Sequence, residues 1–149
     1  MKALIVYDSV YGNTEKIARA VGEAITPSGE AKVLRAGEAN PSELTSVDLF
    51  IVGSPTHGGR PTSAVQDLLN KVPILQGVNV AAFDTRSTSK FARVFGNAAG
   101  RIARNLEKKG GTLVASPEGF FVTGTKGPLK DGELERAKAW AKGILESKK

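Results

Sequence analysis

The sequence predicts an α/β fold built on an open, doubly wound parallel sheet. Strand-type and helix-type hydrophobic periods alternate along the chain, and their lengths fit five strand–helix units. The first strand-type run, Lys2 to Tyr7, is almost continuously apolar, as in a strand that is covered on both faces. Right-handed helical crossovers between such strands give a parallel sheet with helices on both sides.

The elements of the first half follow from local sequence. Between Thr14 and Thr26, apolar residues recur at a spacing of four, which predicts a helix that Pro27 ends. Ala31 to Ala36 predicts a short strand, and Val47 to Val52 predicts a stronger one. Thr62 to Val72 then predicts a helix whose apolar side chains face the sheet.

The second half repeats this pattern. Val78 to Phe83 is the fourth predicted strand, and the long helix after it ends at Gly110 and Gly111. The apolar stripe of that helix consists of Phe91, Phe95, Ala98 or Ala99, Ile102 and Leu106. A fifth strand follows, interrupted at Pro117, because proline cannot donate to a central ladder. The last helix, about Asp131 to Glu146, is expected to bury Leu134, Ala137, Ala141 and Leu145 beside Trp140.

The composition is that of an ordinary globular protein. With 40% hydrophobic and 24% charged residues, the chain is expected to form a single domain over residues 1–149. It contains no cysteine and one histidine, which excludes disulfide scaffolds and thiol chemistry and gives no support to a metal site. The N-terminal segment lacks a signal-peptide pattern, so a cytoplasmic location is expected.

The chain is basic, with 21 Lys and Arg residues against 15 Asp and Glu residues and a net charge of +6. Much of the excess falls in the last third of the sequence. Such a surface can attract nucleic acid, an anionic membrane or an acidic protein. A solvated helix face is nevertheless the commoner explanation of a charge run.

In an open parallel sheet, ligands bind beyond the carboxyl ends of the strands. The loops to consider therefore follow the first, third and fourth predicted strands. They are Asp8 to Thr14, Gly53 to Pro61, and Asp84 to Lys90. All three are rich in small and polar residues, so we expect the ligand site there.

The first loop, SVYGNT, suits a phosphate. Gly12 lets the backbone approach a ligand closely, and the helix that begins at about Asn13 or Thr14 offers unpaired N–H donors. Ser9 and Thr14 add hydroxyl groups. The alternative is that Asn13 or Thr14 merely caps the helix while Gly12 makes a turn. The loop matches neither the P-loop nor the G-x-G-x-x-G pattern, which disfavours a nucleotide triphosphatase and a typical dinucleotide site.

Asp8 and Asp84, both at strand ends, raise a second option, the phosphoacceptor receiver domain. That chemistry needs a carboxylate at the end of the third strand. This chain has Gly53 and Ser54 there, and Asp48 lies at the opposite end of the strand. A receiver domain is therefore disfavoured.

The loops resemble those of the flavodoxins and related FMN-binding flavodoxin-like domains, over essentially the whole chain and with the length of the short-chain subgroup. The first loop is similar to the family's phosphate-binding motif, and its tyrosine resembles the version found in flavodiiron proteins and quinone-reductase relatives. The matching residues are Ser9, Val10, Tyr11, Gly12, Asn13 and Thr14. VGSPTHGGRP is similar to the family's second flavin loop, and FDTRSTS occupies the place of the third.

This resemblance implies a flavodoxin-like sheet of five parallel strands in the order 2-1-3-4-5, with non-covalently bound FMN as cofactor. It also implies electron transfer between redox partner proteins. Because this chain is basic, those partner proteins could have acidic surfaces. Residues Ser9 to Thr14 would hold the phosphate. Pro55, Thr56, His57 and Gly58 would line one side of the flavin ring, and Asp84, Thr85 and Arg86 would line the other.

Two departures from the family pattern are informative. The second loop offers only His57 for stacking on the ring, and the third offers no aromatic residue before Phe91, while Trp140 is expected to pack in the core. A titrating His57 would make the reduction potential depend on pH between about 5 and 8. Flavodoxins are typically acidic, whereas this chain is basic, so Arg60 or Arg86 would raise the potential of the second electron.

Three functions are compatible with these residues. The favoured one is a diffusible FMN electron carrier, because we find no convincing set of catalytic acids and bases. A second is a flavoenzyme that passes reducing equivalents from a nicotinamide to a quinone. A third is a flavin-free binding or regulatory module that uses a basic stripe such as Arg101, Arg104 and Lys108.

Overall fold

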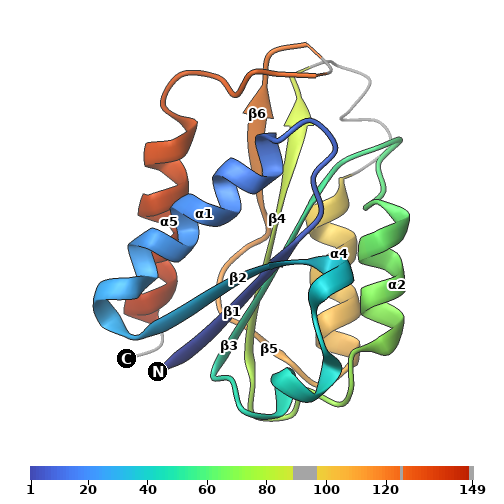
Figure 1. Cartoon of the computed structure of the whole chain (residues 1–149), viewed down its shortest axis with the longest axis vertical. Helices are drawn as coiled ribbons and strands as arrows, with labels where there is room; N and C mark the ends of the chain where they lie inside the picture. Colours follow the sequence, from blue (N-terminus) through green and yellow to red (C-terminus); the bar gives the residue numbers. More distant parts are fainter. Residues whose placement is uncertain (89–96, 125, 148–149) are drawn as a thin grey trace.

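The computed structural model describes residues 1–88, 97–124 and 126–147, and it contains the expected alternation of strands and helices (Figure 1). The strands are β1 (Lys2–Tyr7), β2 (Glu30–Arg35), β3 (Leu49–Pro55), β4 (Asn79–Ser87), β5 (Thr112–Leu113) and β6 (Glu118–Val122). The helices are α1 (Asn13–Ile25), α2 (Ser63–Lys71), α4 (Ala98–Lys108) and α5 (Glu133–Ser147). Short 3-10 turns cover Thr26–Ser28, Ala36–Glu38 and Pro41–Thr45.

All strand pairs within the sheet are parallel, and the order β2-β1-β3-β4-β5 confirms the predicted 2-1-3-4-5 arrangement. The fifth position is shared by two short strands. β5 pairs with the start of β4, and β6 pairs with its end, from Phe83 to Ser87. The break between them contains Pro117, at the place where the sequence predicted an interruption.

Helices cover both faces of the sheet: α1 and α5 lie on one side, and α2 and α4 lie on the other (Figure 1). Successive side chains of a strand point to opposite faces. In β4, Phe83 packs with the α1 and α5 side, whereas Ala82 packs with the α2 and α4 side. The same alternation separates Thr85 from Asp84 and Arg86, and this matters for the candidate site.

The packing of α5 corrects one prediction and confirms another. Leu134 is 40% exposed and not buried as predicted, whereas Leu145 is partly buried against the core. Ile144, which the predicted set left out, is almost fully buried. Trp140 packs edge-on against two phenylalanine rings, with centroid distances of 5.9 Å to Phe83 and 6.1 Å to Phe120. It is therefore a core residue, as expected. The predicted stripe residues Phe91 and Phe95 lie outside the described residues.

Candidate functional site

The loops after β1, β3 and β4 meet at the carboxyl ends of the strands and enclose a pocket of about 290 Å³. The pocket is lined by Ser9, Val10, Tyr11, Asn13, Thr14, Pro55, Thr56, His57, Gly58, Thr85, Arg86, Ser87 and Val122. All the site residues predicted from the sequence line it, except Gly12 and Asp84. Val10 and Tyr11 are each more than half exposed at its rim, whereas Thr14 and Thr85 are buried at its base.

Gly12 shapes the first loop. It has φ +90°, a left-handed conformation that glycine adopts without strain, and it occupies the position just before α1. Its N–H donates to Ser9 Oγ at 3.0 Å, which closes the turn. No side chain caps the helix, so the alternative in which Asn13 or Thr14 is the cap is wrong.

The side chains of Asn13 and Thr14 instead tie the loop to distant parts of the chain. Asn13 Nδ2 donates to the carbonyl oxygen of Lys126 at 3.0 Å, and Thr14 Oγ1 lies 2.7 Å from Thr85 Oγ1. A hydrogen bond between two hydroxyls uses only one of their two hydrogens. The other hydrogen of the Thr14 and Thr85 pair is thus available to a ligand acceptor.

The second loop is a tight turn between His57 and Arg60. Each of these residues donates its N–H to the other's carbonyl oxygen, at 2.9 and 3.0 Å. The central Gly58 and Gly59 have φ +58° and +79°, as a type I′ turn requires. Arg101 Nε of α4 donates to the Gly59 carbonyl at 2.9 Å and holds the turn in place. His57 and Gly58 are exposed and line the pocket.

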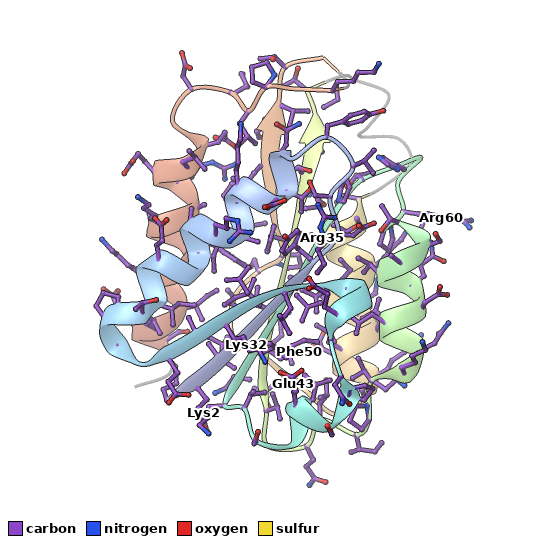
Figure 2. All side chains as sticks on the ribbon, viewed as in Figure 1. Lys2, Lys32, Arg35, Glu43, Phe50 and Arg60 are labelled. Carbon is purple, nitrogen blue, oxygen red and sulfur yellow. The ribbon has the colours of Figure 1, made fainter. Side chains whose placement is uncertain are left out.

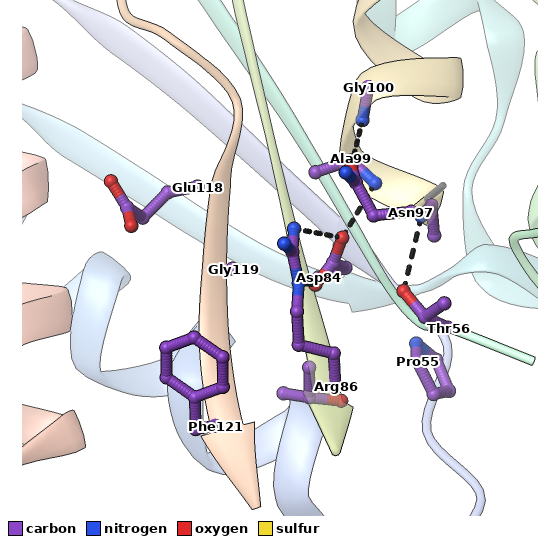
Figure 3. Close-up of polar contacts among 12 residues, drawn as sticks. Pro55, Thr56, Asp84, Arg86, Asn97, Ala99, Gly100, Glu118, Gly119 and Phe121 are labelled. Atoms are coloured by element: carbon purple, nitrogen blue, oxygen red, sulfur yellow. Dashed lines mark hydrogen bonds and ion pairs between the residues drawn. The ribbon is translucent and has the colours of Figure 1, made fainter. Parts of the chain in front are cut away.

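The third loop differs from the prediction at Asp84. This residue is fully buried, and its carboxylate turns toward α4 instead of the pocket (Figure 3). It accepts from Arg86 Nε at 2.7 Å, from Arg86 Nη2 at 2.8 Å and from the Ala99 N–H at 2.9 Å. Because successive β4 side chains alternate, Thr85 is the residue of this strand that reaches the first loop.

The guanidinium of Arg86 is also held by contacts within the protein. It lies over Gly119 of β6, where an added Cβ would collide with it, and it is paired with the buried Asp84 carboxylate. A paired guanidinium does not act on the pocket as a free cation. This geometry opposes the idea that Arg86 raises the potential of a bound flavin.

The N-termini of α1 and α4 lie at the same end of the sheet but differ in their chemistry. The first three N–H groups of α4 are satisfied by side chains: Thr56 Oγ1 at 3.1 Å, Asp84 Oδ2 at 2.9 Å and Asn97 Oδ1 at 2.8 Å. In α1, the N–H groups of residues 13–15 meet no acceptor among the described residues. Of these two helices, α1 alone keeps its N–H donors and partial positive charge for an anion.

Comparison with protein families gives a match to the flavodoxin model over residues 5–140, which is most of the chain. The chain belongs to the flavodoxin family. FMN is the cofactor of this family.

Individual relatives agree with this assignment. The structure of an archaeal flavodoxin is 25% identical, with a TM-score of 0.80 and full coverage of both chains. Rubredoxin:oxygen oxidoreductase of the anaerobe Desulfovibrio gigas is 26% identical, with a TM-score of 0.79, over 98% of this chain and 35% of that one. The protein named diflavin flavoprotein A 2 of Thermosynechococcus vestitus is 30% identical over 115 residues, 72% of this chain and 18% of its own.

The match thus spans only a small part of the curated relatives, between 13% and 18% of the length of the first three. Among the described residues of this flavodoxin-family chain, no group of histidine and acidic side chains could hold a metal ion. No described helix is long and apolar enough to cross a membrane.

Two residues that support the first loop were missed by sequence reasoning. Arg35, labelled in Figure 2, lies at the end of β2. It donates from Nη1 to the Ser9 carbonyl at 3.2 Å and pairs with Asp8 and Glu15. Lys126 accepts from Asn13, and its ammonium lies 5.9 Å from the centre of the Tyr11 ring. Residues 126–132 lie between β6 and α5, and the Lys126 carbonyl ties this stretch to the first loop.

Proposed function

We propose that this chain binds FMN in the pocket between its three loops and carries electrons to and from other redox proteins. The observation that supports the proposal is the N-terminus of α1. Its free N–H groups, the Ser9 hydroxyl and the hydroxyl pair of Thr14 and Thr85 form a donor set for a phosphate ester, with no basic side chain required.

The rest of the lining comes from Pro55, Thr56, His57 and Gly58 after β3 and from Thr85 and Arg86 of β4. In this proposal the flavin ring lies against these residues. The volume, about 290 Å³, is near the lower end for a small-molecule site, and the half-exposed Tyr11 extends the rim. When bound, FMN supplies one- and two-electron chemistry. The chain's own residues orient it, screen its ring from water and leave one edge accessible to partners.

Titration of the purified chain with FMN, followed by flavin fluorescence and calorimetry, tests the binding. We expect one FMN per chain and a loss of affinity of about ten-fold in Thr14→Val, because one donor to a charged phosphate is removed. Ser63→Ala is the matched control, since Ser63 is exposed at the start of α2, outside the pocket. No uptake of FMN by folded protein would refute the proposal.

The second half of the proposal, electron transfer, needs its own measurement. The photoreduced, FMN-loaded chain should reduce a redox protein directly, and it should not oxidise NADH or NADPH in steady state. Rapid turnover of either nicotinamide by the isolated chain would instead support a flavoenzyme of the quinone-reductase kind.

A further inference from the structure

A second cavity, of about 310 Å³, lies between α2 and α4. Its polar lining comes from Arg60, Gln66, Asn70, Arg101 and Asn105. The cavity adjoins the candidate flavin pocket, because both are bordered by the turn between His57 and Arg60. His57 lines the first pocket, and Arg60 lines the second.

The two arginines make this cavity positive. Arg60 is exposed and extends away from α2 into solvent (Figure 2). Neither Arg60 nor Arg101 forms an ion pair with any of the residues that the structure describes. Arg101 uses Nε to hold the turn and retains four N–H donors on its terminal nitrogens.

The positive charge continues along α4 beyond the cavity. Arg101, Arg104 and Lys108 are exposed, and their spacing of three and four residues places them on one face of the helix. None of them is ion-paired within the described residues. At a rise of about 1.5 Å per residue, the row is about 10 Å long. A small anion cannot span that length, whereas the surface of a protein can.

We propose that Arg60, Arg101, Arg104 and Lys108, here called the α4 basic face, dock an acidic redox protein, one of whose carboxylates enters the cavity between the two arginines. The proposal rests on the electron-transfer function proposed above and names its partner. Charge complementarity selects the partner, and the shared turn places it beside the flavin pocket.

A nucleic acid fits this face less well than an acidic protein does. No aromatic side chain is among the residues that line the cavity or form the row, so bases find no stacking platform. Glu107 interrupts the row between Arg104 and Lys108 in sequence and is itself exposed, which disfavours a continuous phosphate backbone. A protein surface, with isolated carboxylates at irregular positions, suits such a mixed pattern better.

The test compares wild type with the double variant Arg60→Gln/Arg104→Gln and with a charge-matched control, Lys130→Gln/Lys142→Gln. The control lysines are exposed, and they lie in and just before α5, on the other side of the sheet. Fluorescence anisotropy measures binding of labelled decaglutamate and labelled oligothymidine at low ionic strength. FMN titration of each protein is run separately.

We expect decaglutamate to bind wild type and the control alike and to bind the Arg60→Gln/Arg104→Gln variant about five-fold more weakly, with a shallower salt dependence. Electron transfer from the FMN-loaded chain to an acidic haem protein, cytochrome b5, should slow only in that variant. Equal losses in both variants would overturn the inference, because overall charge would then explain them. Tighter binding of oligothymidine, lost in the same variant, would also overturn it.

These outcomes separate the two proposals. If FMN binds normally to every variant while decaglutamate binds the Arg60→Gln/Arg104→Gln variant as tightly as wild type, the docking inference fails. The proposed electron-carrier function is then unaffected. If FMN does not bind to wild type, the proposed function fails, and the peptide measurement on the same protein still reports whether the face binds acidic chains.

Discussion

Asp84 and Arg86, two residues apart on β4, form a two-bond ion pair of 2.7 and 2.8 Å in which the carboxylate is fully buried (Figure 3). The same carboxylate accepts the Ala99 N–H at the start of α4. Removing one partner of a buried pair leaves the other uncompensated, so we expect Asp84→Ala to lower the free energy of unfolding by about 3 kcal/mol. Urea unfolding at neutral pH measures this.

Asp84→Asn separates a structural role from flavin contact. The amide keeps an acceptor for Ala99, so the loss of stability should be smaller than in Asp84→Ala. Because the carboxylate faces away from the pocket, FMN affinity should stay within two-fold of wild type at temperatures where the variant is folded. Asp131→Asn, an exposed position, is the control. A ten-fold loss of FMN affinity in Asp84→Asn would contradict this assignment.

The turn before α1 gives a second prediction. Gly12 has φ +90°, and a Cβ there would touch nothing within 4 Å, so only backbone strain opposes Gly12→Ala. That strain amounts to about 1 kcal/mol of stability, and we expect weaker FMN binding because the same turn presents the free N–H groups. Gly37→Ala is the matched control, since its Cβ also meets nothing and its φ is not positive. Thermal unfolding of both variants, with and without FMN, checks the prediction.

The fold could be predicted because each signal was local. The alternation of strand-type and helix-type hydrophobic patterns predicted the order of strands and helices along the chain. Pro117 marked the break between β5 and β6. Helix phase was less certain from sequence: Leu134 and Ile144 lie on the same amphipathic helix, and only the contact with the sheet decides that the first is exposed and the second buried. Packing against the sheet, and not the spacing of apolar residues alone, decides which side chains of α5 are buried.

The site was only partly predictable for a related reason. Loops at the carboxyl ends of parallel strands must meet, so the pocket could be placed from topology alone. The direction of Asp84 depends on the partners that α4 and Arg86 offer it. The supports from Arg35 and Lys126 lie 26 and 113 residues from the loop residues they contact, beyond the reach of any local pattern.

Arg35 is expected to matter for the cofactor more than for the fold. Its side chain is 44% exposed, so its ion pairs with Asp8 and Glu15 are worth only about 0.5 kcal/mol of stability. Its hydrogen bond to the Ser9 carbonyl holds the first loop, so Arg35→Gln should weaken FMN binding about five-fold. Lys32→Gln on the same strand, which breaks the remote pair with Glu43, is the control and should leave FMN binding unchanged.

His57 gives a prediction about contact with the cofactor. It is exposed at the wall of the pocket, within the turn that Arg101 holds. Its imidazole is a flat ring that can stack on a bound flavin ring, so we expect His57→Ala to weaken FMN binding. Titration of wild type and variant with FMN measures this, and equal affinities would exclude a role for this side chain.

The contacts of Glu133, which join α5 to β6, predict how the free energy of unfolding changes at acid pH. Hydrogen bonding to Arg136 is the main cause that lowers the pKa of Glu133; the N–H of Phe121 also lowers it, and burial opposes both. A carboxyl whose folded pKa is depressed contributes stability above its unfolded pKa of about 4.3 and loses it as pH falls through the lower folded value.

The expected size of this contribution is modest, because the Arg136 side chain is 37% exposed and solvent screens the pair. At neutral pH, Glu133→Gln should cost about 1 kcal/mol relative to wild type. The difference should shrink as the pH falls below the unfolded pKa of about 4.3 and through the lower folded pKa, because the Glu133 carboxylate of wild type becomes protonated over that range. Glu135→Gln, an exposed position in the same helical turn, should cost little at any pH. Urea midpoints measured from neutral to acid pH decide this, and a difference that stays constant with pH would show that the charge of Glu133 contributes nothing.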